Sequence, residues 1–261
     1  MFNIQKKIYV FVFIFALFLA ECISSSLPKV LIVVGPPGSG KGYLADFFVR
    51  NYQCGHISAG DLLREEVNKK TPIGISIEDT IRQGKPVANE VMHSLLRAKI
   101  IEGMEKYSLL IIDGFGGQSD EDALFLRNLF EQGNLGGRVI AVFLESADEE
   151  CRRRMEKRLI CNICFRIYNT NTSRPKKENF CDDCDEELIQ RPQDTSETIQ
   201  KRIMRYRTVM EPNYHQFSQM FPYIRFNVDY GKCIEFYQKL ATAMQHLPES
   251  IDPDFVKAPG E

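Results

Sequence analysis

Short apolar runs alternate along the chain with segments of helical periodicity. The runs KVLIVV at 29–34, LLIID at 109–113 and RVIAVFL at 138–144, with a last short one at 223–228, are typical of strands buried in a parallel sheet. Helical patterns occupy the segments between and after them, at 41–52, 62–70, 76–83, 88–106, 120–132, 148–158, 196–210 and 232–246. Alternating strands and helices predict an α/β fold with a parallel sheet.

The first 26 residues have a different pattern. Lys6 and Lys7 precede 13 consecutive apolar residues at 8–20, and Glu21 and three serines follow. A basic start, a short apolar core and a small-residue exit are typical of a signal peptide, and a spanning helix needs roughly 20 residues. We expect a secretory or membrane-anchored protein that associates with membranes through this segment. A buried core helix and a cytoplasmic location are the alternatives.

Composition sets few further limits. The chain has 261 residues, 44% of them hydrophobic, which suffices for one packed domain with an insertion. A net charge of −2 gives no basic field for nucleic acid, so no nucleic-acid partner is expected. We expect a monomer whose anion binding comes from a local site.

The sequence GPPGSGK at 35–41 matches the GxxxxGK phosphate-loop pattern between a predicted strand and a predicted helix. Glycines let backbone N–H groups turn toward a phosphate, the helix N-terminus adds partial positive charge, and Lys41 adds a full one. The alternative is a glycine-rich turn that binds nothing. Asp113 ends the second strand, where a carboxylate can hold Mg²⁺ near the loop; a turn or helix-capping aspartate is its alternative.

Four of the eight cysteines form two CxxC pairs separated by 16 residues, and they are Cys161, Cys164, Cys181 and Cys184. This spacing is typical of a closed tetrahedral zinc site, which would be structural because no ligand position is left open. Two disulfides are the alternative that a secretory route would favour. Residues 160–195 interrupt the helical pattern and look like a small inserted subdomain.

These motifs together resemble the adenylate kinase family, in its long form with a zinc-binding lid. The resemblance rests on GPPGSGKG at 35–42, SAGDLLR at 58–64, GKPVANEV at 84–91, IDGF at 112–115 and the cysteine-rich segment, and it extends from residue 29 to about 245. It implies a P-loop NTPase three-layer sandwich with a parallel sheet, a helical monophosphate-binding insert and a small zinc-ribbon lid. The implied boundaries are a core of 27–57, 89–157 and 196–248, an insert of 58–88, a lid of 158–195 and a tail of 249–261.

The resemblance also implies a role for each matching residue. Phosphoryl transfer would depend on Lys41, Asp113, Arg158, Arg191, Asp194 and Arg202. ATP would contact Gly35, Gly38, Ser39, Gly40, Lys41, Gly42, Tyr43, Arg154, Tyr168 and Lys232. The monophosphate would contact Ser58, Arg64, Lys85, Pro86, Val87, Gly114, Phe115, Arg191 and Arg202.

Five positions depart from the family pattern. Tyr43 replaces a threonine, Ala59 another threonine, Gly117 the arginine that clamps the acceptor phosphate, Leu159 an arginine and Gln193 an aspartate. The expected activity is transfer of the γ-phosphoryl group of Mg-ATP to a nucleoside monophosphate, with AMP the expected acceptor. The alternative is a divergent nucleotide-binding pseudokinase. If the chain is a weakened kinase, Gly117→Arg should recover acceptor affinity.

Overall fold

A computed structural model describes residues 30–52, 54–117, 119–133, 138–230 and 233–246. The signal-like segment at 1–26 and the tail at 249–261 lie outside the described residues, as does Lys232. Among the described residues, no helix is both long enough and apolar enough to cross a membrane.

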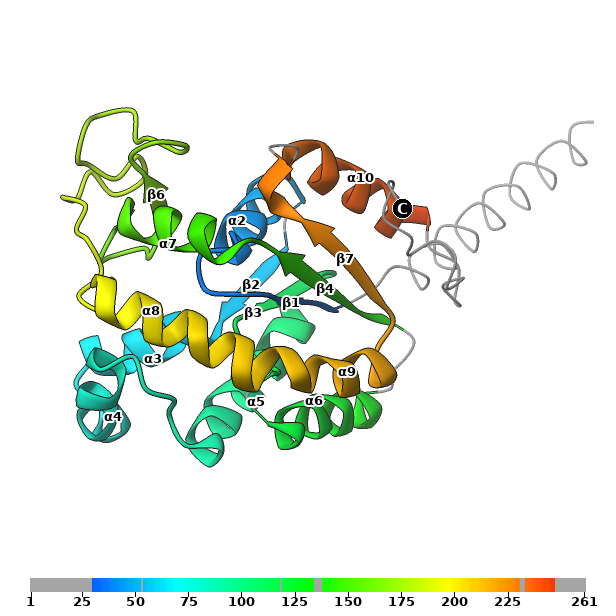
Figure 1. Cartoon of the computed structure of the whole chain (residues 1–261). Helices are drawn as coiled ribbons and strands as arrows, with labels where there is room; N and C mark the ends of the chain where they lie inside the picture. The colour runs from blue at the N-terminus through cyan, green and yellow to red at the C-terminus, as the bar shows by residue number, and fades with distance from the viewer. Residues whose placement is uncertain (1–29, 53, 118, 134–137, 231–232, 247–261) are drawn as a thin grey trace, which may run out of the picture.

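Within the described ranges, five parallel strands form the central sheet in the spatial order β2-β3-β1-β4-β7 (Figure 1). They are β1 (Val30–Val34), β2 (Gly55–Ser58), β3 (Leu110–Asp113), β4 (Val139–Glu145) and β7 (Tyr223–Asn227). All five residues of β1 are buried. A strand at the centre of a sheet that is covered on both faces has no polar side, which explains its unbroken apolar sequence.

Helices cover both faces of the sheet, so the core has three layers. On one face, Val30, Ile32 and Val34 belong to a core cluster with residues of α5, α6 and α9. On the other face, Leu31 and Val33 pack with residues of α2 and α10. The helices are α2 (Lys41–Tyr52), α3 (Ala59–Asn68), α4 (Pro72–Arg82), α5 (Asn89–Lys106), α6 (Asp120–Gln132), α7 (Asp148–Glu156), α8 (Ser196–Arg205), α9 (Glu211–Met220) and α10 (Cys233–His246).

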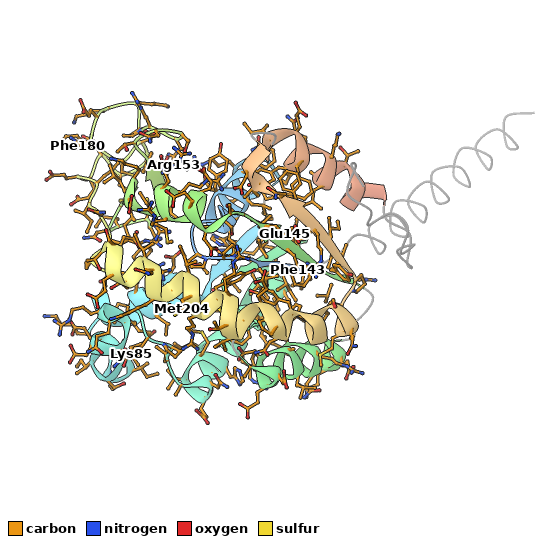
Figure 2. All side chains as sticks on the ribbon, in the orientation of Figure 1. Lys85, Phe143, Glu145, Arg153, Phe180 and Met204 are labelled. Atoms are coloured by element: carbon orange, nitrogen blue, oxygen red, sulfur yellow. The ribbon has the colours of Figure 1, made fainter. Side chains whose placement is uncertain are left out.

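A second, antiparallel sheet lies in the cysteine-rich segment. It pairs β5 (Arg158–Ile160) with β6 (Ile167–Asn169). The segment stands beside α7 at one end of the molecule, with Phe180 toward its outer end and Arg153 on the helix beneath it (Figure 2). The region containing α3 and α4, with Lys85 just beyond it, lies on the opposite side of the carboxyl ends of the strands (Figures 1 and 2). These two regions therefore flank the edge of the sheet where the phosphate loop begins.

The P-loop α/β fold is confirmed, with local corrections. β2 was not predicted, because the four residues GHIS carry only one strongly apolar side chain. Helix α4 begins at Pro72 rather than at 76, since Thr71 caps it and a proline suits its first turn. Helix α7 ends at Glu156, so Arg158 lies on a strand rather than on that helix.

The helix predicted at 196–210 extends further than its pattern indicated. After α8 the chain continues through a π-helical turn, Tyr206–Met210, directly into α9, which was not predicted. Pro212 lies in the first turn of α9, directly after the π-helical turn, where its missing N–H removes one hydrogen bond of the continuous helical segment. This long helical segment brings Arg202, Tyr206 and Tyr214 past the carboxyl ends of the strands.

Candidate active site

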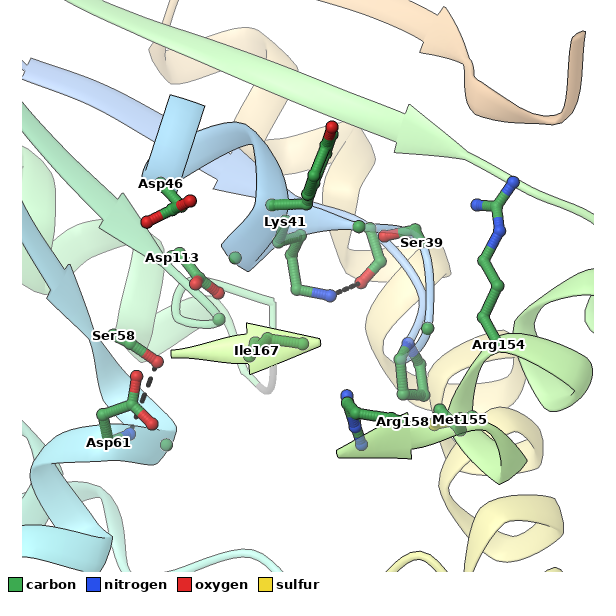
Figure 3. Close-up of a pocket in the computed structure, with 18 of the residues that line it drawn as sticks. Ser39, Lys41, Asp46, Ser58, Asp61, Asp113, Arg154, Met155, Arg158 and Ile167 are labelled. Carbon is green, nitrogen blue, oxygen red and sulfur yellow. Dashed lines mark hydrogen bonds between the residues drawn. The ribbon is translucent and has the colours of Figure 1, made fainter. Parts of the chain in front are cut away.

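A cavity of about 990 Å³ opens where the phosphate loop, the α3–α4 region, the cysteine-rich segment and α8 meet. Figure 3 shows Lys41 at its centre, Ser58, Asp61 and Asp113 on one side, and Arg154 and Arg158 on the other. The cavity therefore lies at the carboxyl ends of parallel strands, the usual place for a ligand in an open α/β sheet.

The phosphate loop has the geometry that its sequence predicted. Gly38 has φ +89°, and a Cβ there would lie 2.4 Å from the carbonyl oxygen of Cys151, so only glycine fits this turn. The Lys41 ammonium donates to the carbonyls of Gly35 and Pro36, at 2.9 Å each. Burial lowers the pKa of Lys41 to about 8, although the nearby Asp113 carboxylate opposes the shift.

Gly42 and Tyr43 follow the lysine at the start of α2. A Cβ at Gly42 would lie 2.8 Å from Cδ1 of Ile167, which stands on β6 of the cysteine-rich segment. Glycine at position 42 therefore lets this segment approach the phosphate loop closely (Figure 3). Tyr43 lines the cavity with its side chain 41% exposed, and its ring lies 6.2 Å from that of Tyr237 on α10.

Asp113 is buried at the end of β3 and accepts a hydrogen bond from Nε2 of His56, at 3.2 Å. Burial would raise the pKa of this carboxyl, but the bond from His56 and the charge of Lys41 outweigh burial and hold it below its usual range. Burial opposes charge on His56 as well, yet the Asp113 carboxylate raises its pKa. Asp113 is thus a carboxylate at the mouth of the loop, a donor type that Mg²⁺ prefers. Its partner His56 was not singled out by sequence, because 57 residues separate the two.

Two arginines bind one carboxylate beside the loop, and a third arginine lies near them. Arg158 donates to both oxygens of Asp194, at 2.8 and 2.7 Å, and Arg202 donates to one, at 3.2 Å. Arg191 is 7% exposed, and its Nε has no hydrogen-bond partner among the described residues. Burial, reinforced by the neighbouring guanidinium groups, lowers the pKa of Arg191 far below its usual value and that of Arg202 to about 10. The cluster carries excess positive charge that an anion would neutralise.

The proposed acceptor residues line the opposite part of the cavity. The lining includes Ser58, Arg64, Lys85, Pro86, Gly114 and Phe115, whereas Val87 is half-buried and is not part of it. Ser58 caps α3 by accepting from the N–H of Asp61. Arg64 is held by the Asp61 carboxylate one turn earlier. Arg205, one turn after Arg202 on α8, also lines the cavity and was not predicted.

Two further residues were predicted to contact ATP, and they differ in how far they reach into the cavity. Arg154 lines the cavity and donates to Glu150 and to the carbonyl of Val228. Tyr168 reaches the lining but is 1% exposed, and its hydroxyl donates to Sγ of Cys181 and accepts from the N–H of Asp182. The ring of Tyr168 therefore belongs mainly to the core of the cysteine-rich segment.

The four predicted metal ligands, Cys161, Cys164, Cys181 and Cys184, come together. Their sulfur atoms all lie within 4.8 Å of one another, and the cysteines are free thiols rather than disulfides. The Sγ atoms of Cys164 and Cys181 are 3.6 Å apart, close to the ~3.8 Å edge of a tetrahedron with Zn–S near ~2.3 Å. Burial raises the pKa of Cys181, but hydrogen bonds from Tyr168 and from backbone N–H groups outweigh burial and lower this pKa to about 7, which favours the thiolate that binds metal. The donor set fits zinc.

Three of the departures from the family pattern are packed into the fold. Ala59 is 4% exposed and belongs to the main core cluster. Leu159 pairs with Tyr168 across β5 and β6 and packs on the core of the cysteine-rich segment. Gln193 is 9% exposed, next to Asp194.

This arrangement defines a class before any relative is considered. A glycine loop between a central strand and a helix, a buried lysine, a carboxylate on the adjacent strand and a cluster of arginines form the phosphate-handling site of a P-loop NTPase fold.

Comparison with known proteins identifies the family. A sequence model of the family described as adenylate kinase matches residues 33–220. The chain is 36% identical over 182 residues to an adenylate kinase of Malacoplasma penetrans, covering 70% of this chain and 80% of that one. It is 38% identical over 176 residues to an adenylate kinase of Chlamydia felis, covering 67% and 79%. It is 29% identical over 218 residues to an adenylate kinase of Pyrococcus abyssi, covering 83% and 96%. The chain therefore belongs to the adenylate kinase family of nucleoside monophosphate kinases.

Proposed function

We propose that the chain transfers the γ-phosphoryl group of ATP to AMP and forms two molecules of ADP. The observation that carries this proposal is the group of Arg158, Arg191 and Arg202 around the single carboxylate of Asp194, next to the phosphate loop. One buried and two half-buried guanidinium groups beside one buried carboxylate are costly unless a polyanion completes the site. Phosphoryl transfer needs this kind of site, because catalysis there is mainly positioning and neutralisation of charge on the moving group.

The donor nucleotide would bind on the phosphate loop. Backbone N–H groups of residues 38–42 would surround its phosphates, and Lys41 would leave the carbonyls of its own loop for the β- and γ-phosphates. Asp113 would hold Mg²⁺ directly or through water, and the metal would neutralise phosphate charge. Arg154 and Tyr43 would contact the rest of ATP from the cavity wall, with Lys232 from the segment before α10.

The acceptor would bind between α3 and α8. Arg64 and Arg202 would hold its phosphate, and the segment that contains Lys85, Pro86 and Val87 would face its base. An oxygen of the acceptor phosphate would attack the γ-phosphorus in line, and the bond between that phosphorus and the bridging oxygen to the β-phosphate would break. No covalent enzyme intermediate is required.

We also propose that the three segments predicted from the sequence have separate roles. Residues 58–88 would bind the monophosphate, residues 158–195 would close over the transfer site as a lid, and the rest of the described chain would be the core. The contact of Ile167 with the phosphate loop at Gly42 supports a lid that excludes water, which would otherwise compete as an acceptor. A structural Zn²⁺ on the four cysteines would hold the lid folded.

A second candidate function is nucleotide binding without transfer. The observations that favour it are the glycine at 117, where no side chain can hold the acceptor phosphate, and the bulky ring of Tyr43 beside the loop. Such a protein would keep the phosphate loop and bind ATP but show no turnover.

The deciding experiment incubates the full chain with Mg-ATP and each of AMP, UMP, CMP and GMP and measures the diphosphate formed. Lys41→Ala supplies the blank. Turnover with AMP well above that blank supports the proposal, and turnover with another acceptor alone would reassign the base. ATP binding without turnover for all four acceptors would favour the second candidate.

We further propose that the N-terminal segment directs the chain into the secretory route or anchors it to a membrane. The support is the sequence pattern at 1–26 alone. Fractionation of cells that express the chain, with mass measurement of its N-terminus, tests this proposal. An intact N-terminus in the soluble cytoplasmic fraction would contradict it.

A further inference from the structure

Gly116 and Gly117, which follow Gly114 and Phe115 in the loop after β3, pack closely against α9. A Cβ built on Gly117 would lie 2.4 Å from Cε1 and 3.0 Å from Cζ of Tyr214. A Cβ built on Gly116 would lie 2.7 Å from Cε2 of Phe217, one turn further along the same helix. Rings held in a packed core cannot yield as the end of a flexible chain can. Position 117 therefore has no room for any side chain while Tyr214 keeps its place.

Tyr214 is firmly held in that place. It is 4% exposed, and its ring lies 5.2 Å from that of Phe143 and 5.8 Å from that of Tyr206. The side-chain amide of the preceding residue, Asn213, donates to the carbonyl of Gly117 at 3.3 Å. The start of α9 thus fixes the acceptor loop through both a ring contact and a backbone hydrogen bond.

The same tyrosine also reaches the phosphate loop. Its hydroxyl lies close enough to the backbone N–H of Gly35, the first glycine of the loop, for that group to oppose the rise in the tyrosine pKa that burial causes, and both residues line the cavity. Gly35 is one of the two residues whose carbonyls accept from Lys41. Tyr214 therefore joins the two loops that are proposed to hold the donor and acceptor phosphates.

We propose that Tyr214 is a positioning residue that sets the distance between the acceptor loop and the phosphate loop, and that the glycine at position 117 exists to make room for it. The proposal rests on the proposed function, because it assigns part of that site. It also predicts, in contrast to the expectation from the sequence, that Gly117→Arg alone will not recover acceptor affinity. The new side chain would meet the ring of Tyr214 before its guanidinium could reach the cavity.

Removal of the hydroxyl tests the link to the phosphate loop. Tyr214→Phe keeps the ring, so we expect a change in melting temperature of only a few degrees and a KM for ATP that rises about three- to tenfold, the value of one hydrogen bond. The KM for AMP should stay within twofold. Tyr223→Phe is the matched control, since Tyr223 lies on β7 outside the cavity lining and should change neither constant. An unchanged KM for ATP in Tyr214→Phe would overturn the link.

A double-mutant cycle tests the link to the acceptor loop. Gly117→Arg alone should lower the melting temperature and should not lower the KM for AMP. In Gly117→Arg/Tyr214→Ala the arginine can occupy the space of the ring, so the KM for AMP should fall at least about tenfold below that of Tyr214→Ala alone, as expected for a charged hydrogen bond. A lower KM for AMP in Gly117→Arg alone, with the melting temperature unchanged, would overturn the proposal.

The two proposals can fail separately. The unmodified chain and Lys41→Ala are assayed first, and no turnover in the unmodified chain with any acceptor would contradict the proposed function. In that case the double-mutant cycle of positions 117 and 214 is measured by melting temperature instead of by KM. Gly117→Ala should destabilise the unmodified chain but not the Tyr214→Ala variant, where the added methyl fills vacated space. Equal destabilisation in both backgrounds would overturn the role of Tyr214 regardless of activity.

Discussion

Asp194 is the residue whose substitution we expect to lower the free energy of unfolding most clearly. Its carboxylate is fully buried and accepts three hydrogen bonds from Arg158 and Arg202. Asp194→Asn keeps the shape but removes the charge, and it turns an NH₂ group toward the guanidinium groups. Breaking a buried ion pair from one side costs about 3–5 kcal/mol, because it leaves uncompensated charge. We expect about 3 kcal/mol, since the amide oxygen still accepts one bond.

The assay is thermal unfolding, followed by steady-state kinetics. For a domain of this size each kcal/mol lowers the melting temperature by roughly 2–4 °C, so we expect a decrease of about 6–12 °C. Because Arg158 and Arg202 lose the group that orients them, kcat should also fall, by about 10- to 100-fold.

A matched control separates burial from charge. Asp183→Asn makes the same chemical change where the carboxylate is 41% exposed and pairs with two arginines, Arg50 at 2.7 Å and Arg166 at 2.9 Å. Exposed pairs contribute about 0–1 kcal/mol, so the melting temperature should move by no more than about 4 °C. If Asp194→Asn were as stable as Asp183→Asn, the argument that the arginine cluster depends on one buried carboxylate would be refuted.

Three further predictions concern the metal, the pH dependence and the acceptor. Metal analysis should find one zinc per chain, and a chelator should lower both melting temperature and activity until zinc is restored; full activity of zinc-free chain would contradict a structural metal. Because burial lowers the pKa of Lys41 to about 8, the free enzyme loses this cation as pH rises through 8, and kcat/KM for ATP should fall there. Below pH 8 Lys41 is charged in both the folded and the unfolded chain, so burial of the charge lowers stability in full. This loss of stability disappears as pH rises from 8 to the usual pKa of 10.5, so the gain in melting temperature of Lys41→Met should shrink over that range. A gain that stays constant would contradict the lowered pKa. Arg205→Ala should raise the KM for AMP about three- to tenfold without changing the KM for ATP. The control Arg207→Ala lies on the same helical segment but is paired with Asp148 and Glu211, and it should change neither KM. Equal effects of the two variants would remove Arg205 from the acceptor site.

The sequence predicted the elements whose pattern is local. The central strand and α2 begin and end almost where expected, because β1 is apolar throughout and the glycine loop marks the start of the helix. The four-cysteine cluster was also predictable, since its spacing is itself the signal. β2 was missed because a short edge strand needs few apolar residues when its partner β3 supplies the pairing.

Contacts between distant segments could not be predicted. His56 and Asp113 meet only because β2 and β3 are neighbours in the sheet. Tyr214 meets Gly117 because the chain continues from α8 through a π-helical turn into α9, which no periodicity in the sequence indicated. The family pattern drew attention to Gly117 as a lost arginine, but only the fold shows which side chain occupies the space.

The departures from the family pattern have partners, and this bears on the choice between kinase and pseudokinase. Tyr43 packs beside Tyr237, Leu159 lies opposite Tyr168, and Gly117 lies against Tyr214. Each of these three changes thus packs against a tyrosine rather than leaving a cavity, as expected for a site whose packing has been remodelled.

The arginine cluster argues in the same direction. A buried group such as Nε of Arg191, which has no hydrogen-bond partner in the described part of the chain, costs about 1–3 kcal/mol of stability. The neighbouring arginines add repulsion to that cost. ATP binding on the phosphate loop alone does not need these extra arginines, so it does not explain the loss of stability that they cause. A site that neutralises a phosphoryl group during its transfer between two nucleotides needs those charges in place before the nucleotides bind. The excess positive charge in the site therefore favours an active kinase with a remodelled acceptor loop over a pseudokinase that only binds nucleotide.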